Sequence, residues 1–199
     1  DAWLSNRSPS FDPYWDDDQC NRSVHGAPAQ AALRLERSSK KTSVTLVDVS
    51  CSGATIQKGI LGPQLRGIKS QIEAVNDLVK GRDIDAIVMS AGGNDVGFGS
   101  ILTSCALQNN CPLATATAPP LSTYPTIQTG IQALTAELPT GYSLINKCFT
   151  DATCTGAQNQ SLPGLSLSPI GQVFLNSYPD PTRSETGSTC SYLTISQED

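Results

Sequence analysis

The sequence predicts an α/β fold in which helices cover both faces of a central parallel sheet. Three segments rich in apolar and β-branched residues, 43–50, 84–90 and 172–179, are interpreted as strands. Segments of helical periodicity lie between them, and strands that are joined through helices pair in parallel. We therefore expect residues 1–199 to form one domain with three layers.

The first half of the chain carries the clearest helix signals. Residues 1–24 have no periodicity and are expected to form an ordered surface loop. A proline opens the helix predicted over 28–36, in the first turn, where proline is tolerated. Apolar residues recur at helical spacing over 68–79, and Gly81 is expected to cap the end of that helix.

The second half alternates between helix and loop signals. A helix is expected to begin near Val96, and residues 106–122 are rich in Ala, Thr and Pro, which is typical of a loop. Helical periodicity returns over 126–138. Residues 155–169 are expected to lie as a loop over the surface.

Charge and hydropathy exclude several classes of partner. The net charge is -5 and the longest basic run is Lys40 and Lys41, so no binding surface for nucleic acid or for an anionic membrane is expected. No apolar run approaches the roughly 18 residues of a transmembrane helix. Residues 1–10 lack the basic and apolar regions of a signal peptide. We expect a soluble chain from which any export signal has been removed.

The cysteines predict disulfides. None of the seven stands in a CxxC pair and the chain has one histidine, so neither a zinc site nor another cofactor is expected. The expected pairs are Cys20 with Cys51, Cys105 with Cys111, and Cys148 with Cys154. Spacing alone leaves this connectivity open, and Cys190 is left unpaired. Disulfides indicate an oxidising compartment, so we expect a secreted protein.

Turns rich in Gly, Asn or Asp follow all three predicted strands. They read DVSCSGAT at 48–55, MSAGGND at 89–95 and NSYPDPT at 176–182. In a parallel sheet the carboxyl ends of the strands lie at one edge, where ligands bind. We therefore expect the three turns to share that edge.

Two of these turns could offer hydrogen-bond donors to one ligand. Gly53 would present a backbone N–H and Asn94 a side-chain amide, and two fixed neutral donors suit a developing oxyanion. Gly92 and Gly93 would allow the tight turn that aims Asn94, and Asp95 could anchor this turn by accepting from backbone N–H groups. The same composition is common where a strand simply ends, so that alternative stays open.

Four sequence blocks together resemble a known family. In chain order they are QCNRSVHGAPAQAALRL, VTLVDVSCSGATI, IDAIVMSAGGNDVGFGSILTSC and FLNSYPDPT. They resemble the SGNH hydrolases of the GDSL esterase and lipase family, nearest its secreted bacterial and fungal members. The resemblance implies a flavodoxin-like sheet and ester hydrolysis through an acyl-enzyme. It also implies an oxyanion hole to which Gly53 and Asn94 contribute.

Two blocks of that family are absent from this sequence. The family's nucleophile lies in a Gly-Asp-Ser block and its general base in an Asp-x-x-His block. His25 lies where the family has no catalytic residue, and Ser52 and Ser90 are expected as turn and strand-end residues. The resemblance therefore implies the middle of a larger domain, whose first strand is central in the order 2-1-3-4-5 and belongs to a missing N-terminal segment. A missing C-terminal segment would carry the histidine and a partner for Cys190.

The leading functional expectation is a secreted carboxylic ester hydrolase, of which this chain carries the oxyanion-stabilising half. Its substrates would be small esters, lipids or sugar esters, and the chain alone would be inactive. A non-catalytic carbohydrate- or lipid-binding protein on the same scaffold is an alternative. A third possibility is a metal-dependent hydrolase that uses Asp48, Asp95 and Asp180, which lie at the expected rim.

Overall fold

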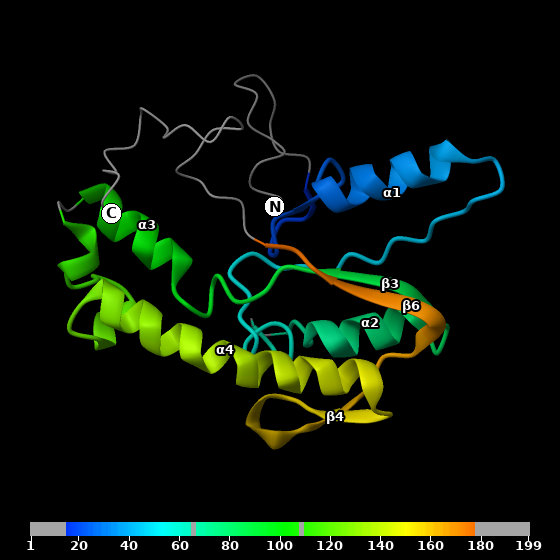
Figure 1. Cartoon of the computed structure of the whole chain (residues 1–199). Coiled ribbons are helices and arrows are strands. Elements are labelled where there is room, and N and C mark those ends of the chain that lie inside the picture. Colours follow the sequence, from blue (N-terminus) through cyan, green and yellow to red (C-terminus); the bar gives the residue numbers. More distant parts are fainter. Residues whose placement is uncertain (1–14, 65–66, 108–109, 178–199) are drawn as a thin grey trace.

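A computed structural model describes residues 15–64, 67–107 and 110–177 (Figure 1). These ranges contain helices and strands in mixed order, as expected of an α/β protein. The helices are α1 (Ala27–Ser38), α2 (Gln71–Val79), α3 (Phe98–Leu107) and α4 (Ile127–Thr150), with 3-10 turns η1 (Cys111–Leu113), η2 (Leu121–Thr123) and η3 (Ala157–Asn159). The strands are β1 (Trp15–Asp17), β2 (Arg22–Ser23), β3 (Ile84–Met89), β4 (Thr153–Thr155), β5 (Ser161–Pro163) and β6 (Leu167–Leu175).

The sheet at the centre of the molecule consists of two parallel strands, β3 and β6. Val88 pairs with Phe174, and Met89 pairs with Leu175. The N–H of Asn176 then donates to the Met89 carbonyl across 2.8 Å. The parallel pairing predicted from the order of elements is therefore confirmed.

Two of the three predicted strands are present with changed bounds, and the third is absent. β3 lies within the predicted 84–90, whereas β6 begins before the predicted 172–179. Residues 43–50 form no strand, so that prediction is wrong. Their composition suits a strand, but a strand also needs a neighbour for its N–H and C=O groups, and no described strand pairs with this segment.

Helices cover one face of the sheet. Figure 1 shows α2 and α4 on the same side of β3 and β6. Ile84, Ile87 and Met89 of β3 pack against a core that includes Ile72 of α2 and Ile145 of α4. This cluster is the main hydrophobic core of the described residues.

On the opposite face, the described residues show only part of the predicted arrangement, because no described helix belongs to a core cluster there. Val88 is 61% exposed and its partner Phe174 is 47% exposed. α1 stands apart from α2 and α4 in Figure 1 and buries none of its residues. Parallel sheets are normally buried on both faces, so the exposure of Val88 and Phe174 in the described part of the chain is unusual.

α2 begins later than predicted because Ser70 caps it. Ser70 Oγ accepts from the Glu73 N–H across 3.2 Å, and the Glu73 carboxylate accepts from the Ser70 N–H across 3.1 Å. This reciprocal pair is a capping box. At the other end, Lys80 with φ of 52° takes the left-handed cap position that we expected for Gly81.

α4 is longer than the helix predicted over 126–138. It continues through Pro139 to Thr150. A proline inside a helix removes one backbone hydrogen bond. Ile145 and Cys148, which follow the proline, are buried, and this packing offsets the loss.

Segments predicted as loops contain short elements. β4 ends at the start of the predicted loop 155–169, β5 lies within it, and the two strands pair with each other. β1 and β2 pair with each other within the predicted loop 1–24. η1 and η2 lie within 106–122. Elements of two or three residues are too short to show a periodicity, so the pattern of the sequence did not reveal them. α1 and α3 begin close to their predicted starts.

Three disulfides confirm the expected pairings. They join Cys20 to Cys51, Cys105 to Cys111, and Cys148 to Cys154. Cys190 lies outside the described residues. Disulfides persist in oxidising compartments, so these bonds are consistent with an extracellular protein. No described helix is long and apolar enough to cross a membrane.

Candidate functional site

The first candidate turn contains Gly53 and is held from two sides. Gly53 has φ of +77°, a left-handed conformation that favours glycine. The Ser52 N–H donates to the Cys20 carbonyl across 3.0 Å, next to the Cys20–Cys51 disulfide. Gln64 Nε2 donates to the Ser52 carbonyl across 2.7 Å. Gln64, which the sequence did not single out, therefore helps to fix this turn.

The second turn follows β3 and leads into α3. Gly92 has φ of +103°. A Cβ atom at this position would lie 2.5 Å from the Tyr142 hydroxyl oxygen, so a larger residue would require the Tyr142 side chain to shift. The Val96 N–H donates to the Gly92 carbonyl across 3.0 Å, and the Phe98 N–H donates to the Gly93 carbonyl across 2.9 Å. These bonds keep the turn tight.

Two side chains join the turns to each other. Asn94 Nδ2 donates to the Ala54 carbonyl across 2.9 Å. The Asp95 carboxylate accepts from the Ile56 N–H, at 3.0 Å to Oδ1 and 3.2 Å to Oδ2. The partners are 40 and 39 residues apart in the sequence. The structure therefore brings the turns of Gly53 and Asn94 together.

Each turn has an N–H group for which the described residues show no acceptor. Among the described residues, none accepts from the Gly53 N–H. The Asn94 side-chain nitrogen carries two N–H groups and uses one of them on Ala54. Two neutral donors on cross-linked turns can stabilise negative charge on an oxygen without first reorganising.

Asp95 is half-buried, and its pKa is raised. Burial is the larger cause, because it disfavours the charged carboxylate. The backbone N–H groups of Ile56, Asp95 itself and Gly92 favour the charged form and oppose this effect. The carboxylate thus serves as an acceptor that holds both turns, at an electrostatic cost.

Ser52, Ser90 and the single histidine, His25, are all exposed. Ser52 lies in the Gly53 turn and Ser90 directly follows β3, as expected of turn and strand-end residues. His25 lies in the turn before α1, and its backbone N–H donates to Ser23 Oγ across 3.2 Å. The serines therefore belong to the rim of the two turns, whereas His25 belongs to the region of α1.

Two of the three carboxylates considered for a metal site are described. Asp48 accepts from the Ser50 N–H across 3.0 Å, and Asp95 accepts from the Ile56 N–H. Asp180 lies outside the described residues. Within the described ranges, no group of three His, Cys, Asp or Glu side chains could hold a metal ion.

An apolar hollow of about 340 Å³ adjoins the second turn. Ala91, Gly92 and Gly93 line one wall, and Leu138 and Tyr142 of α4 line another. The Tyr142 hydroxyl donates to the Ala91 carbonyl across 2.9 Å, which holds α4 against the turn. No charged residue is among the described residues that line this hollow, so it suits an apolar group.

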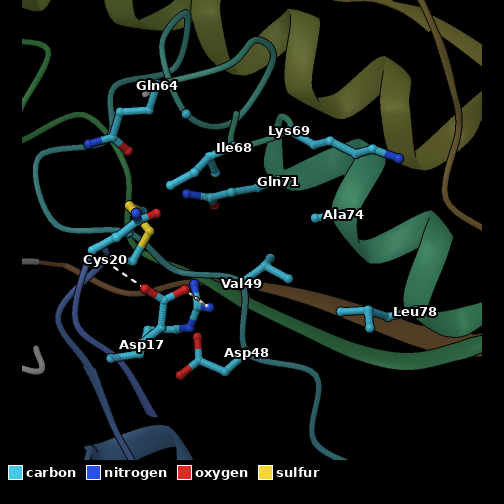
Figure 2. A pocket seen from close by; sticks show the side chains of 14 residues that line it. Asp17, Cys20, Asp48, Val49, Gln64, Ile68, Lys69, Gln71, Ala74 and Leu78 are labelled. Atoms are coloured by element: carbon cyan, nitrogen blue, oxygen red, sulfur yellow. Dashed lines mark hydrogen bonds and ion pairs between the residues drawn. A yellow bond between two sulfur atoms is a disulfide. The ribbon is translucent and has the colours of Figure 1, made fainter. Parts of the chain in front are cut away.

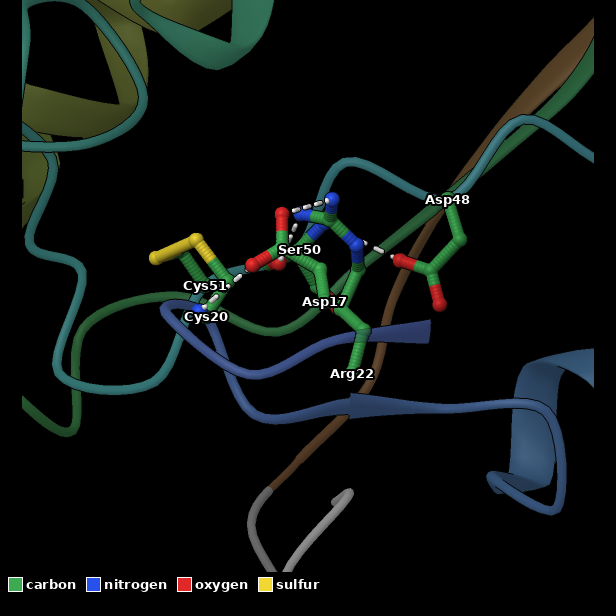
Figure 3. A network of polar contacts seen from close by, with 6 residues as sticks. All are labelled: Asp17, Cys20, Arg22, Asp48, Ser50 and Cys51. Atoms are coloured by element: carbon green, nitrogen blue, oxygen red, sulfur yellow. Dashed lines mark hydrogen bonds and ion pairs between the residues drawn. A yellow bond between two sulfur atoms is a disulfide. The ribbon is translucent and has the colours of Figure 1, made fainter. Parts of the chain in front are cut away.

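A cavity of about 200 Å³ adjoins the first turn (Figure 2). Arg22 Nη2 lies 2.6 Å from Asp17 Oδ2, and Arg22 Nη1 donates to the Ser50 carbonyl across 3.0 Å (Figure 3). Asp17 Oδ1 accepts from the Cys20 N–H across 3.0 Å. This network ties the β1–β2 hairpin to the first turn. Sequence reasoning missed it, because no local pattern links an arginine to a carbonyl 28 residues away.

No family model, curated protein or solved structure matches this chain. The likeness to the SGNH hydrolases therefore rests on the four sequence blocks alone.

Proposed function

We propose that this chain supplies the oxyanion-stabilising half of a secreted serine ester hydrolase. Gly53 and Asn94 are the two donors, and the substrate is a carboxylic ester. The observation that carries the proposal is the 2.9 Å hydrogen bond from Asn94 Nδ2 to the Ala54 carbonyl. This bond fixes one donor against the turn that holds the other.

The reaction needs negative charge on oxygen to be stabilised twice. A serine oxygen attacks the ester carbonyl carbon and gives its proton to a histidine, while the electrons of the C=O double bond move onto the oxygen. The intermediate expels the alcohol, which takes the proton from the histidine, and leaves an acyl-enzyme. Water then repeats these steps and releases the acid. Each oxyanion donor contributes roughly 2.7–4 kcal/mol to the transition state.

The serine and the histidine come, in this proposal, from segments outside residues 1–199. Neither a Gly-Asp-Ser block nor an Asp-x-x-His block is in the sequence. Among the described strands, β3 has β6 as its sole neighbour, so no described strand pairs with its second edge. A further parallel strand could pair with β3 there and with residues 43–50 on its other side. Such a strand would end at the same rim as Gly53 and Asn94, where its serine is needed.

The apolar hollow suits the acyl part of the ester. It adjoins Gly92 and Gly93, the residues that lead into Asn94. Its volume of about 340 Å³ is small among ligand sites, which run from roughly 300 to 1,000 Å³. We therefore expect a preference for short acyl chains.

Hydrolysis of p-nitrophenyl acetate and butyrate by the protein of the intact gene tests this function. We expect saturable turnover that a fluorophosphonate abolishes and that a chelator leaves unchanged, because the nucleophile is a serine. Turnover that the chelator abolishes would instead favour the metal-dependent hydrolase. Absence of turnover on every ester tried would contradict the proposal.

A non-catalytic carbohydrate- or lipid-binding protein is the second candidate. In that case the two cross-linked turns would be kept as a scaffold after the nucleophile and the base were lost. Complete absence of both blocks, rather than substitution within them, favours the ester hydrolase over this candidate. Glycan and lipid binding screens separate the candidates when hydrolysis is measured on every ligand that binds. Binding without turnover by the protein of the intact gene would favour the second candidate.

A further inference from the structure

We propose that Gln64 is a positioning residue, which holds the Ser52–Gly53 peptide group in the orientation that lets the Gly53 N–H act as an oxyanion donor. The observation that carries this is the hydrogen bond from Gln64 Nε2 to the Ser52 carbonyl across 2.7 Å. That carbonyl and the Gly53 N–H belong to the same peptide group. The role in catalysis rests on the proposed function, whereas the orientation of the peptide group does not.

Residues 51–54 form a type II β-turn. The Ala54 N–H donates to the Cys51 carbonyl across 3.1 Å, which closes the turn. Gly53 is the third residue of the turn. Its φ of +77° is close to the roughly +80° of a type II turn and far from the roughly −90° of a type I turn. Ser52 is not among the described residues with positive φ, which excludes the mirror-image turns.

Type II and type I turns differ in the orientation of their middle peptide group, which here joins Ser52 to Gly53. Rotation of this group by about 180° converts one type into the other. Because the C=O and N–H of a trans peptide point in opposite directions, the rotation would put the Ser52 carbonyl oxygen where the Gly53 N–H now points. That oxygen would repel a developing oxyanion. Glycine tolerates φ of either sign, so Gly53 does not itself prevent the rotation.

Among the hydrogen bonds of the described residues, the bond from Gln64 distinguishes the two orientations. The bond from Ala54 to Cys51 closes both turn types. The Ser52 N–H, which donates to the Cys20 carbonyl across 3.0 Å, precedes the group that rotates. The bond from Gln64 depends on the direction of the Ser52 carbonyl and is lost when the group rotates. A donor at the carbonyl also polarises the peptide group, which strengthens the Gly53 N–H as a donor.

The Gln64 side chain is held in place for this role. Leu61, three positions earlier, is fully buried, and its N–H donates to the Ile56 carbonyl across 2.9 Å. Gln64 Oε1 is also buried. The reverse placement of the amide would bring Oε1, in place of Nε2, to the Ser52 carbonyl oxygen, and two acceptors repel each other. The amide therefore presents its donor to the carbonyl.

NMR of the protein of the intact gene tests the orientation without any need for turnover. In a type II turn Ser52 Hα lies close to the Gly53 N–H, so we expect a strong nuclear Overhauser effect between them. In Gln64→Glu a carboxylate oxygen replaces the donor and repels the Ser52 carbonyl, so this effect should weaken. A strong effect in both the wild type and Gln64→Glu would overturn the proposal, and so would a weak effect in the wild type.

Gln30→Glu is the matched control. Gln30 Nε2 also donates to a backbone carbonyl, that of Val24, at 3.3 Å, but it lies in α1. The control introduces the same charge and removes the same kind of bond away from the Gly53 turn. The nuclear Overhauser effect between Ser52 and Gly53 should therefore stay strong.

Hydrolysis of p-nitrophenyl butyrate tests the role of Gln64 in catalysis. At neutral pH, Gln64→Glu should lower kcat about ten-fold or more and change KM little. As the pH falls through the ordinary glutamate pKa of about 4.3, the carboxyl group gains an O–H that can donate to the Ser52 carbonyl. The kcat of this variant, taken relative to wild type at the same pH, should therefore recover. Gln30→Glu should match wild type throughout.

Gln64→Met removes the donor without adding a charge. It should lower kcat about two- to ten-fold at every pH, and it carries both tests if Gln64→Glu does not fold. A merely structural role would lower stability and leave kcat relative to wild type independent of pH in Gln64→Glu, which would contradict the proposal. Because the NMR measurement needs no ester hydrolysis, failure of this proposal and failure of the proposed function are distinguishable.

Discussion

Asn94 Nδ2 donates to the Ala54 carbonyl across 2.9 Å, and this bond joins two turns that are 40 residues apart in the sequence. A second bond between the same segments runs from the Ile56 N–H to the Asp95 carboxylate, at 3.0 Å. Together they fix the Asn94 amide relative to Gly53. Donors that are fixed before the reaction stabilise a developing charge at no cost of reorganisation.

If the proposed function holds, replacement of Asn94 should remove one oxyanion donor. In the protein of the intact gene, Asn94→Ala should lower kcat for p-nitrophenyl butyrate about 10²–10³-fold and change KM little, because the interaction strengthens in the transition state. Asn76→Ala is the matched control, because Asn76 Nδ2 also donates to a distant carbonyl, that of Pro163, at 3.1 Å. It should lower stability by about 1 kcal/mol and leave kcat unchanged. An equal fall of kcat in both variants would assign the effect to stability.

Replacement of Gly92 should destabilise the fold. A Cβ atom in Gly92→Ala would lie 2.5 Å from the Tyr142 hydroxyl oxygen, and φ of +103° is unfavourable for alanine. We expect a loss of roughly 1–3 kcal/mol in the free energy of unfolding, measured in urea. Gly99→Ala, in α3, meets no atom within 4 Å and should be neutral or stabilising by up to about 1 kcal/mol. Equal effects of the two substitutions would contradict the packing described for the second turn.

The disulfides should differ in their contribution to stability. Cys20 and Cys51 are separated by 31 positions, whereas Cys148 and Cys154 are separated by 6. In the chain-entropy model, the loss of the longer link costs about 4 kcal/mol and the loss of the shorter one costs about 2 kcal/mol. Urea unfolding of the two double Cys→Ser variants measures both values. A larger loss for the Cys148–Cys154 pair would show that loop length does not decide the order.

Asp95 should make stability depend on acidic pH. Its pKa in the folded protein is raised above the ordinary value of 3.8, mainly by burial, so the folded state holds this proton more tightly than the unfolded state does. Its contribution to stability is therefore fully present below 3.8 and is lost as the pH rises through the raised pKa. Asp95→Asn cannot titrate, so the difference in unfolding free energy between wild type and this variant should shift in the variant's favour as the pH rises. A difference that shifts the opposite way would mean that the pKa is lowered.

The sequence predicted the elements that carry their own pattern. The apolar run that became β3 and the helical period of α2 were visible without tertiary information. The segment 43–50 has the composition of a strand but forms none, because pairing depends on a neighbour that its own residues do not specify. The continuation of α4 beyond Pro139 could not be predicted for a similar reason. The core that stabilises the helix after the proline is built from segments that are distant in the sequence.

The sequence led us to expect that the turns of Gly53 and Asn94 lie close together, but it did not predict the bonds that join them. Gly53 and Asn94 were selected because turns at the carboxyl ends of parallel strands share an edge. The bond from Asn94 to Ala54 and the support of the Gly53 turn by Gln64 depend on how two loops meet in space. No spacing in the sequence encodes such a meeting. The hydrogen bonds of Arg22 could not be predicted for the same reason, because they join the short β1–β2 hairpin to a turn that is distant in the sequence.

Fluorophosphonate labelling, followed by identification of the labelled peptide, tests the central claim most directly. The purified chain and the protein of the intact gene are treated side by side, and hydrolysis of p-nitrophenyl butyrate is measured before and after labelling. We predict that the chain alone neither reacts nor turns over substrate, and that the label in the intact protein falls on a serine outside residues 1–199. A label on a serine within these residues, with turnover by the chain alone, would contradict the claim that this chain supplies only the oxyanion half of the site.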